Sequence, residues 1–289
     1  MEQKTILVAG GDLRYVYTAR AFRQSCHVCA IGFTRQFLQD PAITLAETAA
    51  DALPLCDALV LPMPVSDDGV LVNAPFSRQS IPLESLLPRL KPDALVFGGK
   101  FGKSRALFTD AGFPVIDYLA SEELAAANAI PTAEGAVQIL LEEMPRTIHG
   151  SRILVLGFGR IGCRMAYILG ALGARVTVAA RQPSDRSRAQ MLGCEAVDYT
   201  QLRAGEYDVL CNTVPAPVIT SELLDAMQPD ALILDLASKP GGVDLEAAQA
   251  LGRRVIWALS LPGKTAPVTA GEIIAETIGH LLEERRCAG

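Results

Sequence analysis

Residues 152–162 read RILVLGFGRIG, an apolar run that ends directly in the spacing G-x-G-x-x-G of Gly157, Gly159 and Gly162. A helical stretch, CRMAYILGALG, and a second apolar run, ARVTVAA, follow at once. In this context the first glycine makes a tight turn, the second admits a pyrophosphate, and the third lets helix and strand pack closely. The stretch therefore predicts a Rossmann dinucleotide-binding domain. A glycine-rich turn without a ligand is the weaker alternative.

The end of the second apolar run indicates which dinucleotide is bound. Sites for NAD carry Asp or Glu about 20 residues past the glycines, where the carboxylate binds the ribose hydroxyls. Here that place is taken by Arg181, with Ser184 and Arg160 as possible helpers. A guanidinium suits a 2′-phosphate, so the sequence predicts NADP. An ordinary solvated arginine is the alternative.

Further apolar runs alternate with helical stretches on both sides of this motif, which is typical of parallel α/β sheets. Two sets of five or six runs predict two doubly wound parallel-sheet domains joined by a long helix. The runs cover 5–10, 27–32, 58–63, 94–99 and 114–118, and then 152–157, 174–180, 195–197, 208–213, 231–236 and 254–259.

The joining helix is expected over 121–144, with Pro131 breaking its pattern and Thr132 capping its second half. The predicted domains are a flavodoxin-like substrate domain over 1–128 and a Rossmann NADP-binding domain over 129–269. Thr269 and Glu272 have capping-box spacing, so a terminal helix over 270–289 is expected to complete the first domain.

Composition narrows the function classes. The 289 residues are 50% hydrophobic and 20% charged, and the net charge of −6 argues against a nucleic-acid partner, which needs a basic face. No apolar run approaches the roughly 18 residues of a membrane span, and the first residues carry no signal-peptide pattern. Seven scattered cysteines and three histidines predict neither a disulfide framework nor a metal site, and they fit a cytoplasmic protein.

Loops after the strands supply the rest of the cofactor site, because ligands bind at the carboxyl ends of strands in open α/β sheets. The loops after 208–213 and 231–236 are expected to line the nicotinamide. The full set of predicted cofactor-binding residues is Gly157, Phe158, Gly159, Arg160, Ile161, Gly162, Arg181, Ser184, Thr213, Val214, Pro215, Leu236, Ala237 and Ser238.

The first domain offers a candidate anion cradle. Gly10, Gly11 and Arg14 follow its first strand at the start of a helix. A tight turn capped by Asp12 is nearly as plausible. Pro64 and Ser66 end the third run at the same edge, and an interdomain cleft is expected between these loops and the nicotinamide.

Two-domain chains of this kind include the D-2-hydroxyacid dehydrogenases, which need a catalytic histidine near the last strand of the cofactor domain. Here that stretch reads WALSLPGKTAP and holds none. Alcohol–carbonyl chemistry of that type is therefore not expected.

The run of motifs instead closely resembles the A subunits of bacterial dipicolinate synthases. The resemblance is carried by VAGGDLR (8–14), NAIPTAEGAVQ (128–138), HGSRILVLGFGRIG (149–162), NTVP (212–215), LILDLASKPGG (232–242) and LPGKTAPVTAGEII (261–274). It extends over nearly the whole chain. Ser260 is a departure, since a glycine is expected before LPG.

The resemblance implies NADP-dependent oxidation of dihydrodipicolinate to dipicolinate in the mother cell of a sporulating bacterium, in partnership with a flavodoxin-like B subunit. One substrate carboxylate would then be held by Arg14 with the Gly10 and Gly11 amides, and the other by Lys239 or Lys264. Asp12 and Glu134 are candidate bases, but solvent can also take the proton. The alternatives are a reductase of a small keto or imino acid and a non-catalytic NADP-binding subunit. A homo-oligomer is possible.

Overall fold

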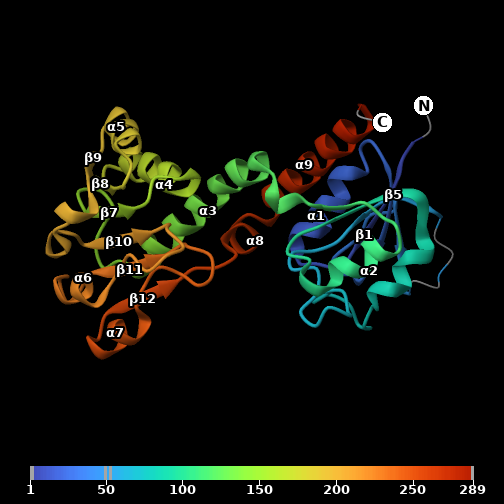
Figure 1. The fold of residues 1–289 in the computed structure, drawn as a ribbon, viewed down its shortest axis with the longest axis horizontal. Coiled ribbons are helices and arrows are strands. Elements are labelled where there is room, and N and C mark those ends of the chain that lie inside the picture. The colour runs from blue at the N-terminus through green and yellow to red at the C-terminus, as the bar shows by residue number, and fades with distance from the viewer. Residues whose placement is uncertain (1–2, 49–50, 52–53, 288–289) are drawn as a thin grey trace. The chain divides into compact units, whose positions relative to one another are not determined.

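The computed structural model describes residues 3–48, 51 and 54–287. The chain divides into two compact units, Met1–Asn128 with Ala266–Gly289, and Ala129–Thr265 (Figure 1). Each unit is a parallel α/β sheet with its own helices. Two doubly wound parallel sheets joined by a long helix are thus confirmed.

The sheet of the first unit has the order β3-β2-β1-β4-β5-β6, all parallel. Without β3 at the edge, the remaining strands follow the flavodoxin-like order 2-1-3-4-5. The elements are β1 (Thr5–Ala9), α1 (Leu13–Phe22), β2 (His27–Ile31), β3 (Ile43–Ala46), β4 (Cys56–Val60), β5 (Leu90–Gly98), α2 (Arg105–Asp110), β6 (Val115–Asp117) and α9 (Pro267–Cys287).

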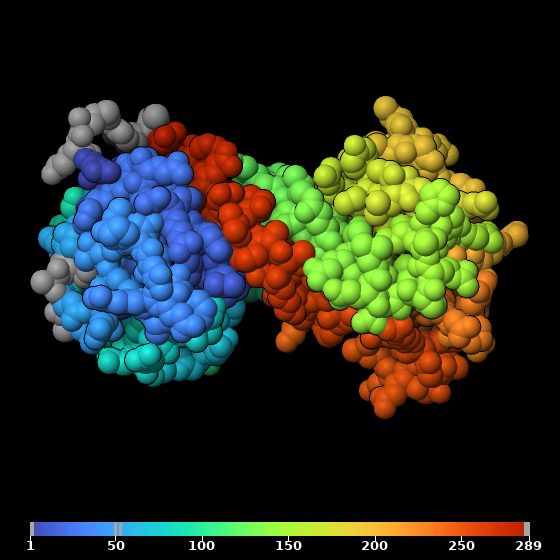
Figure 2. Space-filling view, turned by 180° about the vertical axis from the view of Figure 1, so that it is seen from behind, coloured from blue at the N-terminus to red at the C-terminus, as the bar shows by residue number. Residues whose placement is uncertain are grey.

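Strand β1 shows how this sheet is buried on both faces. Successive side chains of a strand point to opposite faces. Ile6 and Val8 accordingly pack into the core that contains α1 and α9, while Leu7 and Ala9 pack into the core on the other face. Figures 1 and 2 both show the red terminal helix α9 lying along the blue helix α1.

The sheet of the second unit has the order β12-β11-β10-β7-β8-β9. Read from the β9 edge, this is the Rossmann order 3-2-1-4-5-6. Its switch point lies between β7 and β10, where the chain turns from one half of the sheet to the other. The elements are β7 (Arg152–Leu156), α4 (Arg160–Ala171), β8 (Arg175–Ala179), α5 (Pro183–Met191), β9 (Glu195–Val197), β10 (Val209–Asn212), α6 (Ser221–Asp225), β11 (Leu232–Asp235), α7 (Leu245–Ala250), β12 (Arg254–Trp257) and α8 (Leu261–Thr265).

The joining helix α3 runs unbroken over Glu122–Glu143, with Pro131 inside it. The expected break at Pro131, with Thr132 capping a second helix, is therefore wrong. Proline removes one backbone hydrogen bond from a helix interior, but tertiary packing can outweigh that loss. Ala133, Ala136 and Leu140 of this helix are fully buried in the core of the second unit.

The same helix is, in the described part of the chain, the one that is long and apolar enough by composition to cross a membrane. Buried core helices of other proteins can have the same length and apolar composition. Part of the apolar composition of α3 belongs to the protein core, because Ala133, Ala136 and Leu140 are buried there.

Helix α9 begins at Pro267, so the capping box expected at Thr269 does not form. Proline is favoured in the first helical turn, because its fixed φ suits the helix and its missing N–H has no partner there anyway. The amide of Ala270 already donates to the carbonyl of Ala266 at 2.9 Å. Residues 288 and 289 of the predicted terminal helix lie outside the described residues.

Candidate functional site

The three glycines of the loop after β7 differ in what an added side chain would meet at each position. Gly157 has a φ of +90°, and a Cβ there would lie 2.7 Å from the hydroxyl of Thr213. A Cβ on Gly162 would lie 2.2 Å from the carbonyl oxygen of Gly157. Gly159 precedes the first turn of α4, is exposed, and has no atom within 4 Å of an added Cβ. The loop thus leaves open space at the amino end of α4, where dinucleotide-binding folds hold a pyrophosphate.

A cavity of about 220 Å³ lies at this loop, at the carboxyl ends of β7, β8 and β10. It brings together seven of the predicted cofactor residues, and it adds four residues that the motif did not indicate. The predicted ones are Gly157, Phe158, Gly159, Arg181, Thr213, Val214 and Pro215, and the added ones are Ala180, Gln182, Asp185 and Tyr199.

The other predicted cofactor residues lie outside the lining of this cavity. Arg160, Ile161 and Gly162 form the first turn of α4, and exposed Ser184 lies in the first turn of α5. The remaining three, Leu236, Ala237 and Ser238, follow β11; the first two are buried and the third is exposed.

Arg186 fixes the loop that carries Arg181. Its Nη1 atom donates to the carbonyl oxygen of Ala180 at 2.7 Å and to that of Arg181 at 2.8 Å. The same atom lies 3.0 Å from a carboxylate oxygen of Asp198. The side chain of Arg181 itself is exposed at the rim of the cavity, available to an anion. Sequence reasoning missed Arg186, because nothing in the local pattern separates it from Arg188.

A buried polar pair holds the two loops that follow β10 and β11. The amide nitrogen of Asn212 donates to Asp235 at 2.8 Å and to the carbonyl of Val214 at 3.0 Å. Asp235 in turn accepts from the backbone amides of Ala237 at 3.0 Å and Gly242 at 2.9 Å. Both side chains are almost completely buried. The signal that would have found them is a polar residue as the last member of two neighbouring apolar strands.

In the first unit, the two glycines after β1 do not form the expected carboxylate cradle. The amide of Gly10 donates to the carbonyl of Ile31, and that of Gly11 to the carbonyl of Asn73, each at 2.8 Å. An amide already bonded to a carbonyl has no second proton for an anion. Both glycines have positive φ values, so the pair makes a tight turn.

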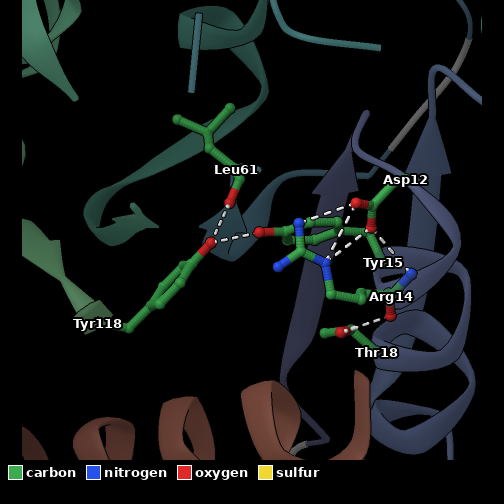
Figure 3. A network of polar contacts seen from close by, with 6 residues as sticks. All are labelled: Asp12, Arg14, Tyr15, Thr18, Leu61 and Tyr118. Carbon is green, nitrogen blue, oxygen red and sulfur yellow. Dashed lines mark hydrogen bonds and ion pairs between the residues drawn. The ribbon is translucent and has the colours of Figure 1, made fainter. Parts of the chain in front are cut away.

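Arg14 is buried and paired with the residue that caps its helix (Figure 3). Asp12 accepts the backbone amide of Arg14 at 3.0 Å, and its two oxygens accept from Nε at 2.9 Å and Nη2 at 2.8 Å. Burial lowers the pKa of Arg14, but the hydrogen bonds with Asp12 and the electrostatic interactions with Tyr15, Asp12 and Tyr118 together raise it above its usual value. The capping reading of Asp12 therefore holds, and both oxygens of this candidate base are engaged. Only Nη1 of Arg14 has no hydrogen bond among the described residues.

Two buried tyrosines, Tyr15 and Tyr118, belong to the same polar network as Arg14 (Figure 3). The hydroxyls of Tyr15 and Tyr118 are 2.6 Å apart, and Tyr118 donates to the carbonyl of Leu61 at 3.2 Å. Burial raises the pKa of Tyr15 to about 12 and the pKa of Tyr118 as well, so both hydroxyls stay protonated at neutral pH. The network anchors α1 to the end of β4 and to the turn after β6.

The remaining predicted substrate and base residues are of two kinds. Half-buried Pro64 and Ser66 follow β4, and the hydroxyl of Ser66 donates to Asp68 at 2.9 Å, so it serves a local turn. The three others, Lys239, Lys264 and Glu134, are exposed, with no ion pair or hydrogen bond within residues 3–48, 51 and 54–287.

One exposed group of potential metal ligands occurs in the described residues, formed by Glu123, Glu276 and His280. The imidazole Nδ1 of His280 lies 2.8 Å from Glu123, so these two groups are already engaged with each other. Cys26, just before β2, and Cys29, on that strand, are free thiols.

Comparisons with known proteins match both units. Residues 5–119 match the family of the N-terminal domain of dipicolinate synthase A subunits. Residues 125–251 match the family described as D-isomer specific 2-hydroxyacid dehydrogenase, NAD binding domain.

Three individual proteins illustrate the similarity. The dipicolinate synthase A subunit of Bacillus subtilis (strain 168) is 31% identical over 286 residues, which is 96% of each chain. The crystal structure of the dipicolinate synthase A subunit from Bacillus halodurans has a TM-score of 0.89 and 30% identity, covering 96% of this chain and 97% of that one. Shikimate dehydrogenase (NADP(+)) of Geobacillus kaustophilus is 31% identical over 135 residues, 42% of this chain and 49% of that one.

Proposed function

The chain belongs to the family of dipicolinate synthase A subunits, and we propose that it catalyses NADP-dependent oxidation of dihydrodipicolinate to dipicolinate. The observation that carries the proposal is the pairing, in one chain, of that family's N-terminal domain with an NAD-binding dehydrogenase domain whose glycine loop leaves room for a dinucleotide. The dehydrogenase domain supports an oxidoreductase that uses a nicotinamide cofactor.

The residues at the second unit's cavity fit this cofactor. Open space beside Gly159 and the backbone amides at the start of α4 suit the pyrophosphate, and Thr213 and Val214 lie at the switch point for the nicotinamide side. When bound, NADP⁺ supplies the hydride acceptor. The substrate ring loses one hydride and one proton, and the pyridine ring becomes aromatic.

The choice of NADP rests on Arg181. Its exposed guanidinium stands where NAD enzymes carry an acid, and Arg186 fixes the backbone on which it is mounted. The partial match to an enzyme named for NADP(+) supports the same choice. Asp185 also lines the cavity, but it is paired with Arg188 at 3.4 Å.

Calorimetry on the purified chain tests this cofactor choice. We expect NADPH to bind at least tenfold more tightly than NADH, about 1.4 kcal/mol. Arg181→Asp is expected to erase or reverse that preference, while Arg175→Asp, an exposed arginine at the start of β8, leaves it unchanged. Equal affinities in the parent chain would rule out the role of Arg181.

For the substrate, the proposal assigns cations to two carboxylates. The remaining Nη1 atom of Arg14 is proposed to bind one carboxylate, and Lys239 or Lys264 to bind the other. Correct placement of the ring matters more than a strong base, because aromatisation supplies driving force. The proton goes to solvent or to exposed Glu134, since Asp12 is engaged with Arg14.

Within its family role, the protein is proposed to act with a flavodoxin-like B subunit, in the cytoplasm of the mother cell during sporulation. That partner gives the second candidate function, a non-catalytic NADP-binding subunit. The engagement of Asp12 with Arg14 favours it, because of the two predicted bases only the exposed carboxylate of Glu134 is then without a partner among the described residues.

One assay separates the two candidates. Freshly generated dihydrodipicolinate and NADP⁺ are added to the isolated chain, with and without the B subunit, and the near-ultraviolet absorbance of reduced nicotinamide is followed. We expect turnover by the chain alone. Turnover only when both subunits are present would assign this chain the non-catalytic role.

A further inference from the structure

A second cavity, of about 440 Å³, lies in the first unit beyond the carboxyl ends of β2 and β3. The carboxyl ends of parallel strands are the usual place for ligands in open α/β sheets. Its volume lies in the range of small-molecule pockets, about 300–1,000 Å³. The proposed function uses none of the residues that line it.

Two short loops frame this cavity and are fixed to each other. Phe37 from the loop after β2 stacks on Phe76, with ring centroids 3.9 Å apart and an angle of 19° between the rings. The backbone of the first loop is closed by the bond from Phe37 N to Thr34 O at 3.0 Å. In the second loop, the hydroxyl of Ser77 donates to the carbonyl of Gln79 at 2.6 Å. The frame is therefore held before any ligand arrives.

Apart from Ser77, the hydrogen-bond donors among the side chains that line the cavity have no partner in the described part of the chain. Arg35 and Arg78 come from different loops, and neither guanidinium has an ion pair or hydrogen bond in the described part of the chain. By contrast, Arg14 and Arg23 of the same unit are each paired with an aspartate. The side chains of Thr34, Gln36 and Gln79 line the cavity as well, likewise without a partner among the described residues.

The other lining residues narrow the class of ligand. Leu45 and Phe33 contribute apolar surface, which suits a carbon skeleton better than a bare inorganic ion. Glu47 is the carboxylate in the lining, so the charged lining residues carry a net charge of about +1 without a ligand. Guanidinium groups bind carboxylates in bidentate fashion, and two of them suit two carboxylates.

We propose that this cavity is a binding site for a small organic dicarboxylate, separate from the dinucleotide cavity and from the substrate contacts assigned above. Arg35 and Arg78 each bind one carboxylate, the two glutamine amides donate further hydrogen bonds, and the carbon skeleton lies against Leu45. Only the choice of the first probe, pyridine-2,6-dicarboxylate, rests on the proposed function.

The test is calorimetric titration of the full chain, without nucleotide, with three probes: pyridine-2,6-dicarboxylate, pyridine-2-carboxylate and inorganic phosphate. We expect the dicarboxylate to bind at least tenfold more tightly than either of the others. Arg35→Gln and Arg78→Gln should each weaken its binding roughly tenfold or more, because each removes one charge-assisted contact. Both positions are exposed, so these variants are expected to fold normally. Arg175→Gln, an exposed arginine away from the cavity, serves as the matched control.

Lys239→Ala and Lys264→Ala distinguish this site from the proposed substrate contacts. A binding event that persists in these variants but is lost in Arg35→Gln and Arg78→Gln supports a separate site, because the proposed substrate contacts can bind the same dicarboxylate. Loss of affinity in them, with full affinity in Arg35→Gln and Arg78→Gln, would overturn it. Equal affinity for phosphate and the dicarboxylate would overturn the ligand class. Since no nucleotide or turnover is involved, the outcome does not depend on whether the proposed oxidation is correct.

Discussion

Gly159 is the residue at which the fold and the ligand make different demands. The chain itself leaves space for a side chain there, whereas a bound pyrophosphate would occupy that space. Gly159→Ala should therefore lower nucleotide affinity at least tenfold, about 1.4 kcal/mol. The same change should lower folding stability by less than about 1 kcal/mol, the usual effect of alanine at a helix N-cap.

Calorimetry for binding and thermal unfolding for stability check this prediction. Gly170→Ala is the control, because this glycine also has open space around it but lies at the far end of α4. It should leave affinity unchanged. If Gly159→Ala keeps full affinity for the nucleotide, the loop is a turn and not a phosphate site.

Ser260 adopts a conformation that favours glycine. Its φ of +60° is in the left-handed region, at the position where the resemblance led us to expect a glycine. That conformation costs a non-glycine residue about 1–2 kcal/mol, partly offset by the greater unfolded-state freedom of glycine. Ser260→Gly should raise the free energy of unfolding by up to about 1 kcal/mol and Tm by roughly 2–4 °C.

Thermal unfolding of the variant measures this effect. Ser187→Gly, on the exposed face of α5, should instead lower stability, because glycine disfavours a helix interior. A Tm for Ser260→Gly at or below that of the parent would mean that the hydroxyl stabilises the turn by more than the strain costs.

Single residues differ in how far sequence predicts their role. The glycines at 157 and 162 could be interpreted from spacing alone, since their constraints come from nearby residues of the same motif and its neighbouring loop. Arg14 could not, because an arginine two residues after an aspartate does not reveal that the arginine is buried and bonded to that aspartate. Asn212 and Asp235 are 23 residues apart, so their bond exists only once β10 and β11 are side by side.

At the scale of elements, α3 and α9 are joined by an exposed pair within the first unit. Nδ1 of His280 lies 2.8 Å from Glu123, and this hydrogen bond and charge raise the pKa of His280, with Glu276 and Glu283 adding to the effect. A histidine with a raised pKa stabilises the fold fully below its unfolded pKa of about 6.5. That contribution is lost as pH rises through the folded pKa.

An NMR titration of the imidazole signals measures this pKa. The signal of His280, assigned by its loss in His280→Gln, should titrate above about 6.5. Glu123→Gln should move its pKa down towards that value. A midpoint at or below it in the parent chain would contradict the contact between α3 and α9.

Elements were predictable where their own residues decide them. The strands of both sheets, apart from β3, overlap the predicted apolar runs, although β4 and β5 begin earlier than predicted. Strand β3 was not predicted, because its four residues, ITLA, are half-exposed at a sheet edge and form no such run. The predicted helix break at Pro131 and the predicted capping box at Thr269 were wrong because tertiary packing outweighs local preferences. Local breaking and capping preferences are each worth only a few kcal/mol, and packing of α3 and α9 on their sheets overrides them.

For the whole molecule, the first unit is assembled from both ends of the chain. Helix α9 closes over α1, where the hydroxyl of Thr18 donates to the carbonyl of Gly271 at 3.0 Å. A Cβ on Gly271 would lie 2.3 Å from the carbonyl oxygen of Arg14, so only glycine allows this approach. The second unit, by contrast, contains its complete sheet between Ala129 and Thr265 and does not include either helix.

Gly271→Ala should therefore separate the stabilities of the two units. The added methyl forces α9 away from α1, and overpacking of this kind costs typically about 1–3 kcal/mol. In scanning calorimetry, we expect the transition of the first unit to move to lower temperature. The transition of the second unit should stay in place and still rise when NADP is added, because a ligand stabilises the unit that binds it. Gly279→Ala, in the same helix but with open space around it, should leave the first transition in place or raise it by a few degrees, because alanine favours a helix interior, and should not change the second. A single transition that falls as one in Gly271→Ala, with nucleotide affinity lost, would show that the two units do not fold independently.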